Sequence, residues 1–421
     1  MRHWRRKMIE GKELPKDWKL VKLGDIATYI NGKAFKPTEW SKKGIPIIRI
    51  QNLNRDKSIY NYCNFPVDKK YYVNNGDLLF AWSGTPDTSF GAHIWKGEKA
   101  VLNQHIFRIV VDENKITKFY YLYALNHKVK EFVSKAHGTA GLAHITKKKF
   151  EESEISLPPL PEQNLIVAKL EELLSELEKG KEQLHTALDQ LRVYRQSVLK
   201  YAFEGKLTNK NVRDGELPKG WKVCPISNIA EINPKLPNKE DLSPNLEVQF
   251  LPMKLVEEII NRINLNEIRL LSEVQKGSYT PFINGDVIFA KVTPCMENGK
   301  IAIVENLKNG IGYGSSEFHV IRPIKEVINK YIFYFVVQDR FRNEAANAMT
   351  GAVGLRRVPK QFIENHTISI PSIQEQKLII EEIEDRLSVA DKLEETITAS
   401  LQQSETLRQS ILKKAFEGKL V

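Results

Sequence analysis

The chain has 421 residues, is 42% hydrophobic and carries a formal net charge of +11. This length supports two or more domains with cores of their own, and it excludes a miniature scaffold that depends on disulfide bonds. The excess of Lys and Arg favours a polyanionic partner such as nucleic acid, although charge alone does not identify that partner.

The cysteines and the N-terminal segment indicate where the protein acts. Cys63, Cys224 and Cys295 are odd in number and far apart, without Cys-x-x-Cys spacing, which excludes a cysteine zinc cluster and favours free thiols in a reducing compartment. The basic segment 1–7 lacks the apolar core of a signal peptide, and no apolar run reaches the roughly 18 residues of a membrane span. We therefore expect a cytoplasmic protein with no metal site and no membrane partner.

An internal repeat runs through the chain, and its first copy begins near the N-terminus. Leu-Pro-Lys-Asp-Trp-Lys at 14–19 returns as Leu-Pro-Lys-Gly-Trp-Lys at 217–222. Further along, Asn-Gly-Asp-Leu-Leu-Phe-Ala at 75–81 matches Asn-Gly-Asp-Val-Ile-Phe-Ala at 284–290. A turn pair followed by an apolar run is typical of a buried strand. The repeat therefore predicts two globular domains that share a scaffold.

The segments between these matches differ between the two copies. Residues 53–74 and 292–315 resemble nothing in the other copy, so the two scaffolds carry different surfaces. Within the second segment, the glycine-rich sequence at 310–314 has no clear strand before it and no clear helix after it. We therefore expect a loop there rather than a cofactor site.

The tail of each copy repeats most closely. Residues 141–207 and 354–420 align at an almost constant offset, and both tails end in Ala-Phe-Glu-Gly-Lys-Leu. A glycine just beyond a helix commonly caps it, so Gly205 and Gly418 mark the expected helix ends.

Two long helices are predicted within these tails. The prolines of 158–161 cannot lie inside a helix, and Glu162 begins a stretch of strong helix formers that 373–421 repeats. Apolar residues recur about every seven positions in both stretches, which predicts one apolar stripe on each helix. The stripe residues are Leu170, Leu177, Leu184, Leu191, Val198, Ile383, Leu387, Ile397, Leu401 and Ile411. Either the two stripes pair with each other, or each stripe packs on its own domain.

The connectivity of the chain fixes the direction of such a pair. The first helix leads from domain one to domain two, and the second helix starts at domain two, so the pair is antiparallel. The predicted fold class is α+β, with two pseudo-two-fold-related α/β domains separated by a long antiparallel two-helix coiled coil. The predicted boundaries are 1–160 for domain one, 161–207 for the central helix, 208–372 for domain two and 373–421 for the C-terminal helix. A two-fold arrangement that carries two DNA-recognition domains suits two half-sites on one DNA duplex.

The repeated motifs resemble the specificity subunits of type I restriction-modification systems. The carriers are the Leu-Pro-Lys-x-Trp openings, the Glu-Gln pairs at 162–163 and 375–376, and the Ala-Phe-Glu-Gly-Lys-Leu ends, and the resemblance covers essentially the whole chain. It implies that each globular unit is a target-recognition domain for one half of a split, asymmetric DNA sequence. It also implies that the helices set the gap between the half-sites and recruit two adenine methyltransferase (modification) subunits, with restriction subunits joining the full complex.

The same resemblance implies that the chain is not an enzyme, and that S-adenosylmethionine, ATP and Mg belong to the partner subunits. The motifs agree with this expectation. An adenine methyltransferase needs Asn/Asp-Pro-Pro-aromatic, whereas the only Pro-Pro pair, 158–159, has leucine on both sides. No Gly-x-x-x-x-Gly-Lys-Ser/Thr phosphate loop is present. His105 and His319 occupy matched places, and we expect scaffold hydrogen bonds from them, with a nucleic-acid contact as the alternative.

Base reading needs polar or cationic side chains on loops that enter a groove. Two equivalent basic loops, 141–149 and 354–360, precede the helices, and two further loops, 82–85 and 291–293, follow the matched strands. The candidate DNA-binding residues on these loops are Lys147, Lys148, Lys149, Arg356, Arg357, Lys360, Trp82, Ser83, Thr85, Lys291 and Thr293. For the basic loops three interpretations stay open: a solvated charge cluster, anchoring of DNA phosphates, and contact with bases.

A function of a different class also fits the repeat. A coiled-coil scaffold whose globular domains bind proteins would have the same helices and the same duplicated domains. Salt dependence separates the two hypotheses, because binding to DNA phosphates weakens steeply as the salt concentration rises.

Overall fold

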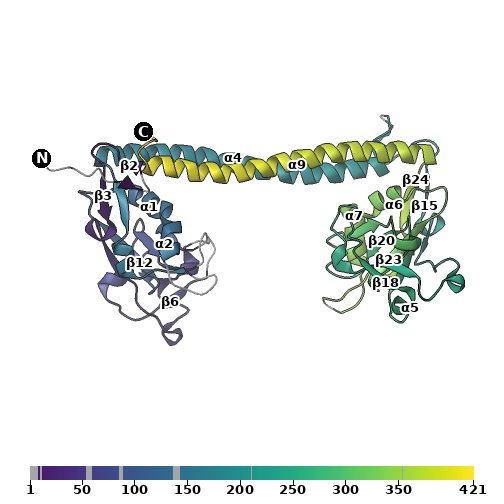
Figure 1. Cartoon of the computed structure of the whole chain (residues 1–421), viewed down its shortest axis with the longest axis horizontal. Helices are drawn as coiled ribbons and strands as arrows, with labels where there is room; N and C mark the ends of the chain where they lie inside the picture. Colours follow the sequence, from purple (N-terminus) through teal and green to yellow (C-terminus); the bar gives the residue numbers. More distant parts are fainter. Residues whose placement is uncertain are drawn as a thin grey trace. The chain divides into compact units, whose positions relative to one another are not determined.

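The computed structural model of the chain consists of two compact units, each with a globular domain and parts of two long helices, α4 (Leu160–Phe203) and α9 (Ile373–Phe416) (Figure 1). Unit 1 comprises Met1–Leu184 and Ala399–Val421, and unit 2 comprises His185–Thr398. The structure describes all residues except 1–7, 10–11, 54–58, 85–88, 136–142, 210 and 353, and it leaves the side chains of 8–9, 12–13, 135, 143 and 239 undescribed.

Two four-stranded sheets form the globular part of unit 1. The first sheet has the order β10-β8-β12-β4, with the bounds Gly91–Ile94, Leu78–Ala81, Ile106–Val111 and Ala27–Asn31. The second has the order β6-β5-β11-β7, with the bounds Asn61–Cys63, Ile45–Ile48, Ala100–Leu102 and Tyr72–Val73. The shorter strand pairs are β1 (Met8–Ile9) with β2 (Lys12–Glu13), β3 (Lys19–Lys22) with β14 (Glu154–Leu157), and β9 (Ser83–Gly84) with β13 (Ala143–His144). The helices are α1 (Lys118–His127), α2 (Val129–Lys135) and α3 (Lys147–Glu151).

Unit 2 repeats this plan. Its first sheet has the order β16-β23-β20-β21, with the bounds Ala230–Ile232, Phe318–Pro323, Val287–Ala290 and Ile301–Ile303. Its second has the order β18-β17-β22-β19, with the bounds Glu267–Leu270, Glu247–Leu251, Ile311–Gly314 and Thr280–Ile283. A strand pair joins β15 (Lys222–Pro225) to β24 (Thr367–Ile370). The helices are α5 (Leu271–Val274), α6 (Asn329–Val336), α7 (Asp339–Ala348) and α8 (Lys360–Asn365).

The predicted buried strands are confirmed, and the packing explains why they are wholly apolar. Every residue of β8 and of β20 is buried. In unit 1, Phe80 packs with residues of α1, α2 and α3, whereas its neighbour Leu79 packs with residues of the second sheet. In unit 2, Phe289 likewise packs with residues of α6 and α7, whereas its neighbour Ile288 packs with residues of the second sheet. Because apolar groups cover both faces of these strands, no position on them is left for polar residues.

The expectation of a loop at 310–314 was wrong. Residues Ile311–Gly314 form β22, which pairs in parallel with β17 and antiparallel with β19. The glycines are explained by close packing, since a Cβ at Gly312 would lie 2.1 Å from a Phe282 ring carbon and one at Gly314 would lie 2.7 Å from the Leu251 carbonyl oxygen. Because Gly312 and Gly314 have no side chains, Tyr313 is the largest residue of this strand.

The start of α4 differs slightly from the prediction. The helix begins at Leu160, so Pro161 lies inside its first turn rather than before it. A proline is tolerated there because the first N–H groups of a helix have no partner within the helix.

Both helix ends are capped as the glycines predict. Gly205 and Gly418 have φ values of 72° and 69°. The N–H of Lys206 bonds to the carbonyl of Tyr201 at 2.9 Å, and Lys419 bonds to Lys414 at 2.9 Å, which is the Schellman arrangement.

In each unit, half of α4 lies beside half of α9, and both halves pack on the domain (Figure 1). In unit 1 the start of α4 meets the end of α9, where Leu170 shares a buried cluster with Ile411. In unit 2 the end of α4 meets the start of α9, where Val198 shares a buried cluster with Ile383. The two helix segments are therefore antiparallel within each unit.

The predicted stripe residues fall into two groups by burial. Leu170, Leu191, Val198, Ile383 and Ile411 are buried, and Leu177, Leu184, Leu387, Ile397 and Leu401 are half-buried. Four of the buried residues belong to domain cores: Leu170, Val198, Ile383 and Ile411. The two alternatives for the stripes are thus compatible, because at its domain end a stripe touches both the other helix and the globular core.

The repeated Glu-Gln motif at the helix starts has a structural reason. Gln163 and Gln376 are fully buried, and each side chain forms three hydrogen bonds to backbone groups of its own unit. A buried amide with all three bonds satisfied fixes its helix to its domain.

Candidate nucleic-acid interface

Two of the predicted DNA-binding loops lie next to each other in unit 1. Strand β9 pairs with β13, which places Ser83 opposite His144. The N–H of Ile145 also donates to the carbonyl of Trp82 at 3.1 Å. We call residues 82–84 and 143–145 the unit 1 loop pair.

The side chain of Trp82 is held from several sides. Its indole N–H donates to Oδ1 of Asn31 at 3.2 Å. Its ring stacks on Phe107, with 5.7 Å between centroids, and meets the rings of His105 and His144 edge-on at 5.3 and 4.5 Å. The predicted residue Thr85 lies outside the described residues.

The equivalent segments of unit 2 form the same contact. Val292 and Arg357 form an isolated β-bridge, and the N–H of Val358 donates to the carbonyl of Lys291 at 2.8 Å. The N–H of Thr293 also donates to the carbonyl of Arg356 at 3.1 Å. We call residues 291–293 and 356–358 the unit 2 loop pair. The structure therefore brings the two predicted loops of each unit together.

Several of the predicted cations already have partners within the protein. Nζ of Lys147 donates to the carbonyl of Tyr29 at 2.8 Å, and Lys360 pairs with Glu364 at 2.8 Å. Arg357 forms a two-point ion pair with Glu317, which lowers the pKa of that carboxyl group. Lys149 is also engaged in a contact within the protein, so it is not free. These residues are less available to DNA than their positions in the sequence indicate.

Two cations remain exposed without such partners. Within the described part of the chain, no hydrogen bond or ion pair engages the side chain of Lys148 in unit 1 or of Arg356 in unit 2. Lys291 is half-buried, close enough to contribute to the lowered pKa of Glu317.

The matched histidines lie beneath the loop pairs. In unit 2, Nε2 of His319 donates to the carbonyl of Val358 at 2.8 Å, and its Nδ1 accepts the Nδ2–H of Asn233 at 3.0 Å. Burial lowers the pKa of His319, so the neutral ring is favoured. The expected scaffold hydrogen bond is therefore confirmed for this residue. The ring of His105 differs, because its buried Nδ1 has no partner among the described residues.

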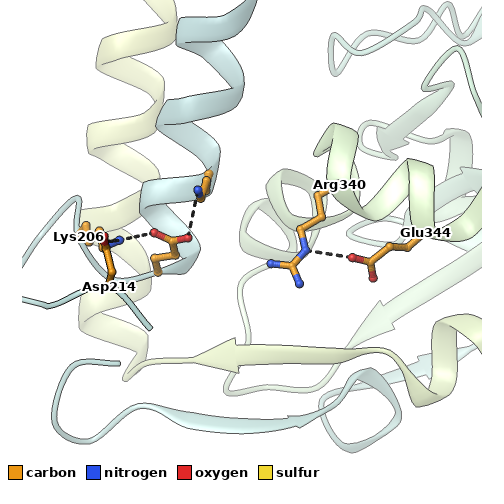
Figure 2. A network of polar contacts seen from close by, with 6 residues as sticks. Lys206, Asp214, Arg340 and Glu344 are labelled. Carbon is orange, nitrogen blue, oxygen red and sulfur yellow. Dashed lines mark hydrogen bonds and ion pairs between the residues drawn. The ribbon is translucent and has the colours of Figure 1, made fainter. Parts of the chain in front are cut away.

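A pocket of about 570 Å³ lies elsewhere in unit 2, between the end of α4, α7 and β24. None of the predicted DNA-binding residues lines it. Its charged lining consists of three cations and three carboxylates: Arg192, Lys200, Arg340, Glu204, Asp339 and Glu344. Figure 2 shows ion pairs in this region, with Arg340 3.0 Å from Glu344 and Lys206 2.6 Å from Asp214. Because the charges balance, this pocket does not provide a surface for a polyanion.

Among the described residues, no group of three or more His, Cys, Asp or Glu side chains could hold a metal ion. No described helix is long and apolar enough to cross a membrane.

Comparison with known proteins identifies the family. The model for the type I restriction modification DNA specificity domain matches residues 15–185 and again residues 218–403. The chain therefore belongs to this family and has two copies of its domain, which confirms the resemblance predicted from the repeated motifs. Specificity subunits of this kind recognise DNA and are not catalytic, since catalysis lies in separate subunits.

Two specificity subunits match the sequence of this chain over different lengths. The chain is 44% identical over 166 residues to the type I restriction enzyme EcoAI specificity subunit of Escherichia coli, covering 39% of this chain and 28% of that protein. It is 26% identical over 430 residues to the EcoBI specificity subunit of Escherichia coli, covering 96% of this chain and 86% of that protein. The EcoAI match thus spans under a third of that relative.

Solved structures share the fold. One is a chain from a study of complex assembly and conformational transition of the type I R-M system, with a TM-score of 0.72 and 17% identity, covering 97% of this chain and 100% of that chain. Another is the HsdS subunit from Thermoanaerobacter tengcongensis, with a TM-score of 0.59 and 17% identity, covering 97% and 99%.

Proposed function

We propose that the chain reads a bipartite, asymmetric DNA site, with one half-site bound by each unit. The observation that carries this proposal is that equivalent loop pairs present unlike side chains. Residues 82 and 143 are Trp and Ala in unit 1, whereas the equivalent residues 291 and 356 in unit 2 are Lys and an exposed Arg, on the same backbone contacts. Since base identity is read by side chains in a groove, equal frames with unlike side chains suit two unlike half-sites.

We also propose that two adenine methyltransferase subunits, and restriction subunits with them, dock on this chain. The close repeat of residues 141–207 by residues 354–420 supports two similar docking surfaces, because it places similar side chains at equivalent positions of the two long helices. S-adenosylmethionine, ATP and Mg would then be bound by these partners, and the assembly would act on DNA in the cytoplasm.

The direct test is to combine the chain with its cognate methyltransferase subunit and to sequence the methylated DNA. The expected result is a motif of two short base blocks separated by a fixed, unread gap. Methylation at a single uninterrupted short sequence would contradict the two-reader proposal.

A second experiment tests the role of the helices. Inserting one heptad into α4 and one into α9 should change the gap length and leave both base blocks unchanged, because seven residues keep the helix faces in phase. Changed base blocks at an unchanged spacing would contradict the proposal that the helices set the gap length.

Salt dependence separates DNA reading from the scaffold hypothesis. Affinity for a DNA duplex should fall steeply between low and moderate salt, since binding releases counterions from the phosphates. Binding that does not change with salt would favour a protein partner.

A further inference from the structure

Two neighbouring arginines of the unit 2 loop pair have opposite surroundings. Arg357 donates from Nε and Nη2 to the two oxygens of Glu317, at 2.9 and 2.8 Å, and from Nη1 to the carbonyl of Leu355 at 3.3 Å. All three nitrogens of its guanidinium group are therefore engaged within the protein. A fork that is filled in this way has little left to offer a base.

Arg356 differs, because its backbone is fixed and its side chain is free within the described residues. Its carbonyl accepts the N–H of Thr293. Thr350 and Arg357 exchange N–H···O bonds of 3.0 and 2.8 Å, so a closed hairpin carries Arg356. The side chain of Arg356 is exposed, and no hydrogen bond or ion pair within the described part of the chain engages it.

The residue before it strengthens the contrast. Leu355 is 58% exposed on the same hairpin. An exposed leucine beside a free arginine suits a base edge in the major groove, where apolar groups meet thymine methyl groups and arginine meets guanine. A phosphate contact would need only the cation.

We infer that Arg356 reads a guanine in the half-site of unit 2, and that Arg357 is a positioning residue which acts through Glu317. This inference rests on the proposed DNA-reading function. The guanidinium group of Arg356 donates two hydrogen bonds to O6 and N7 of the guanine, while the Arg357–Glu317 pair holds the hairpin in place. The two neighbouring arginines, which look alike in the sequence, thus have different roles.

The test uses the full chain in complex with its methyltransferase subunits and a library of DNA duplexes randomised across both half-sites. Wild-type protein is measured first, and absence of any two-block preference would refute the proposed function itself. Arg356→Ala should then reduce discrimination at one guanine of one block by about 5- to 150-fold, with the other block unchanged. Arg356→Gln should shift that position toward adenine, because a glutamine side chain matches N6 and N7 of adenine.

The positioning role has its own measurement. Arg357→Ala and Glu317→Gln should lower affinity for all sequences similarly and keep the guanine as the preferred base, and the double variant should add little to either single one. Arg340→Ala is the charge-matched control, since Arg340 lies on α7 with an 83% exposed side chain, and it should change neither profile.

Three results would overturn the inference. Equal weakening of every sequence by Arg356→Ala, with a salt slope smaller by about one, would make Arg356 a phosphate contact. An unchanged base profile would remove it from the interface. Loss of the guanine preference in Arg357→Ala alone would exchange the two roles.

Discussion

The side-chain oxygen of Gln163 accepts the backbone N–H of Thr117 at 2.8 Å, at the point where the long helix α4 leaves its domain. The amide nitrogen of the same residue donates to the carbonyls of Lys115 and Pro158, both at 2.9 Å. Gln376 makes the matching set in unit 2, with Ile328 as its N–H donor at 2.9 Å. One amide thus joins the start of its helix to two separate backbone segments.

Replacing either glutamine with alanine should therefore destabilise its own unit. Gln163→Ala and Gln376→Ala each leave buried backbone groups without partners, and we expect a loss of about 1–3 kcal/mol in the free energy of unfolding. Urea denaturation measures this loss. Gln403→Ala, at an exposed position of α9, is the control and should leave the transition unchanged. A transition midpoint equal to wild type in both buried variants would contradict the role of the motif.

The glycine caps provide a second prediction. A Cβ at Gly205 would lie 2.3 Å from Cγ of Pro218, and one at Gly418 would lie 2.3 Å from Cγ of Pro15, both with positive φ. Alanine at either position should cost about 1–3 kcal/mol through strain and overlap. Gly180→Ala is the matched opposite, because that glycine lies within α4 with no atom within 4 Å of a new Cβ. It should raise stability by up to about 1 kcal/mol, and equal effects at all three sites would disprove this explanation.

An ion pair joins α4 to α9 within unit 2. Arg195 contacts Asp391 at 2.5 Å and Glu394 at 2.7 Å, and its side chain is 22% exposed. Because both carboxylates are more than half exposed, Arg195→Ala should cost no more than about 1 kcal/mol, and less at high salt. Thermal unfolding at low and high salt measures this. Arg192→Ala, 83% exposed, should show no salt-dependent loss, and a similar loss there would point to general charge effects.

Burial of histidines predicts how stability depends on pH. The pKa of His319 lies below its ordinary value of 6.5, chiefly because of desolvation, and His93, His105 and His366 are lowered for the same reason. Below about pH 6.5 the unfolded chain takes up protons on these residues while the folded chain does not, so stability is present at neutral pH and falls as the pH falls. Urea denaturation at about pH 7.5 and 5.5 tests this window.

A variant of His319 isolates its share of this dependence. His319→Gln keeps a donor for the Val358 carbonyl and an acceptor for Asn233 but does not titrate. It should reduce the loss of stability on acidification without removing it, because the other three histidines remain. An unchanged pH slope would assign the effect to other groups.

The sequence predicted the parts of the fold that follow from local pattern. The strands at 78–81 and 287–290, both long helices and their glycine caps were visible as apolar runs, periodicity and turn residues. The strand at Ile311–Gly314 was missed because the three glycines of 310–314 look like a loop until the close neighbours Phe282 and Leu251 are known. The repeated Glu-Gln motif was visible, but its bonds to turns some 50 residues away were not.

The candidate interface could be predicted only in outline. The sequence showed which loops were basic, but it could not show that Ile145 binds Trp82 or that Val358 binds Lys291, since each pair is more than 60 residues apart. It treated Arg356 and Arg357 alike because the partner of Arg357, Glu317, lies 40 residues earlier in the chain. Availability of a cation is decided by tertiary contacts, which composition does not record.

The division of the chain also bears on its synthesis. The core of unit 1 includes Ile411 and Phe416, and the hydroxyl of Ser156 donates to the carbonyl of Phe416 at 3.0 Å. Unit 2, by contrast, is one continuous stretch, His185–Thr398. A ribosome therefore delivers every residue of unit 2 before it delivers the last ones of unit 1. The domain made first finishes folding last, and its open apolar surface must be shielded from aggregation until the final helix turns emerge.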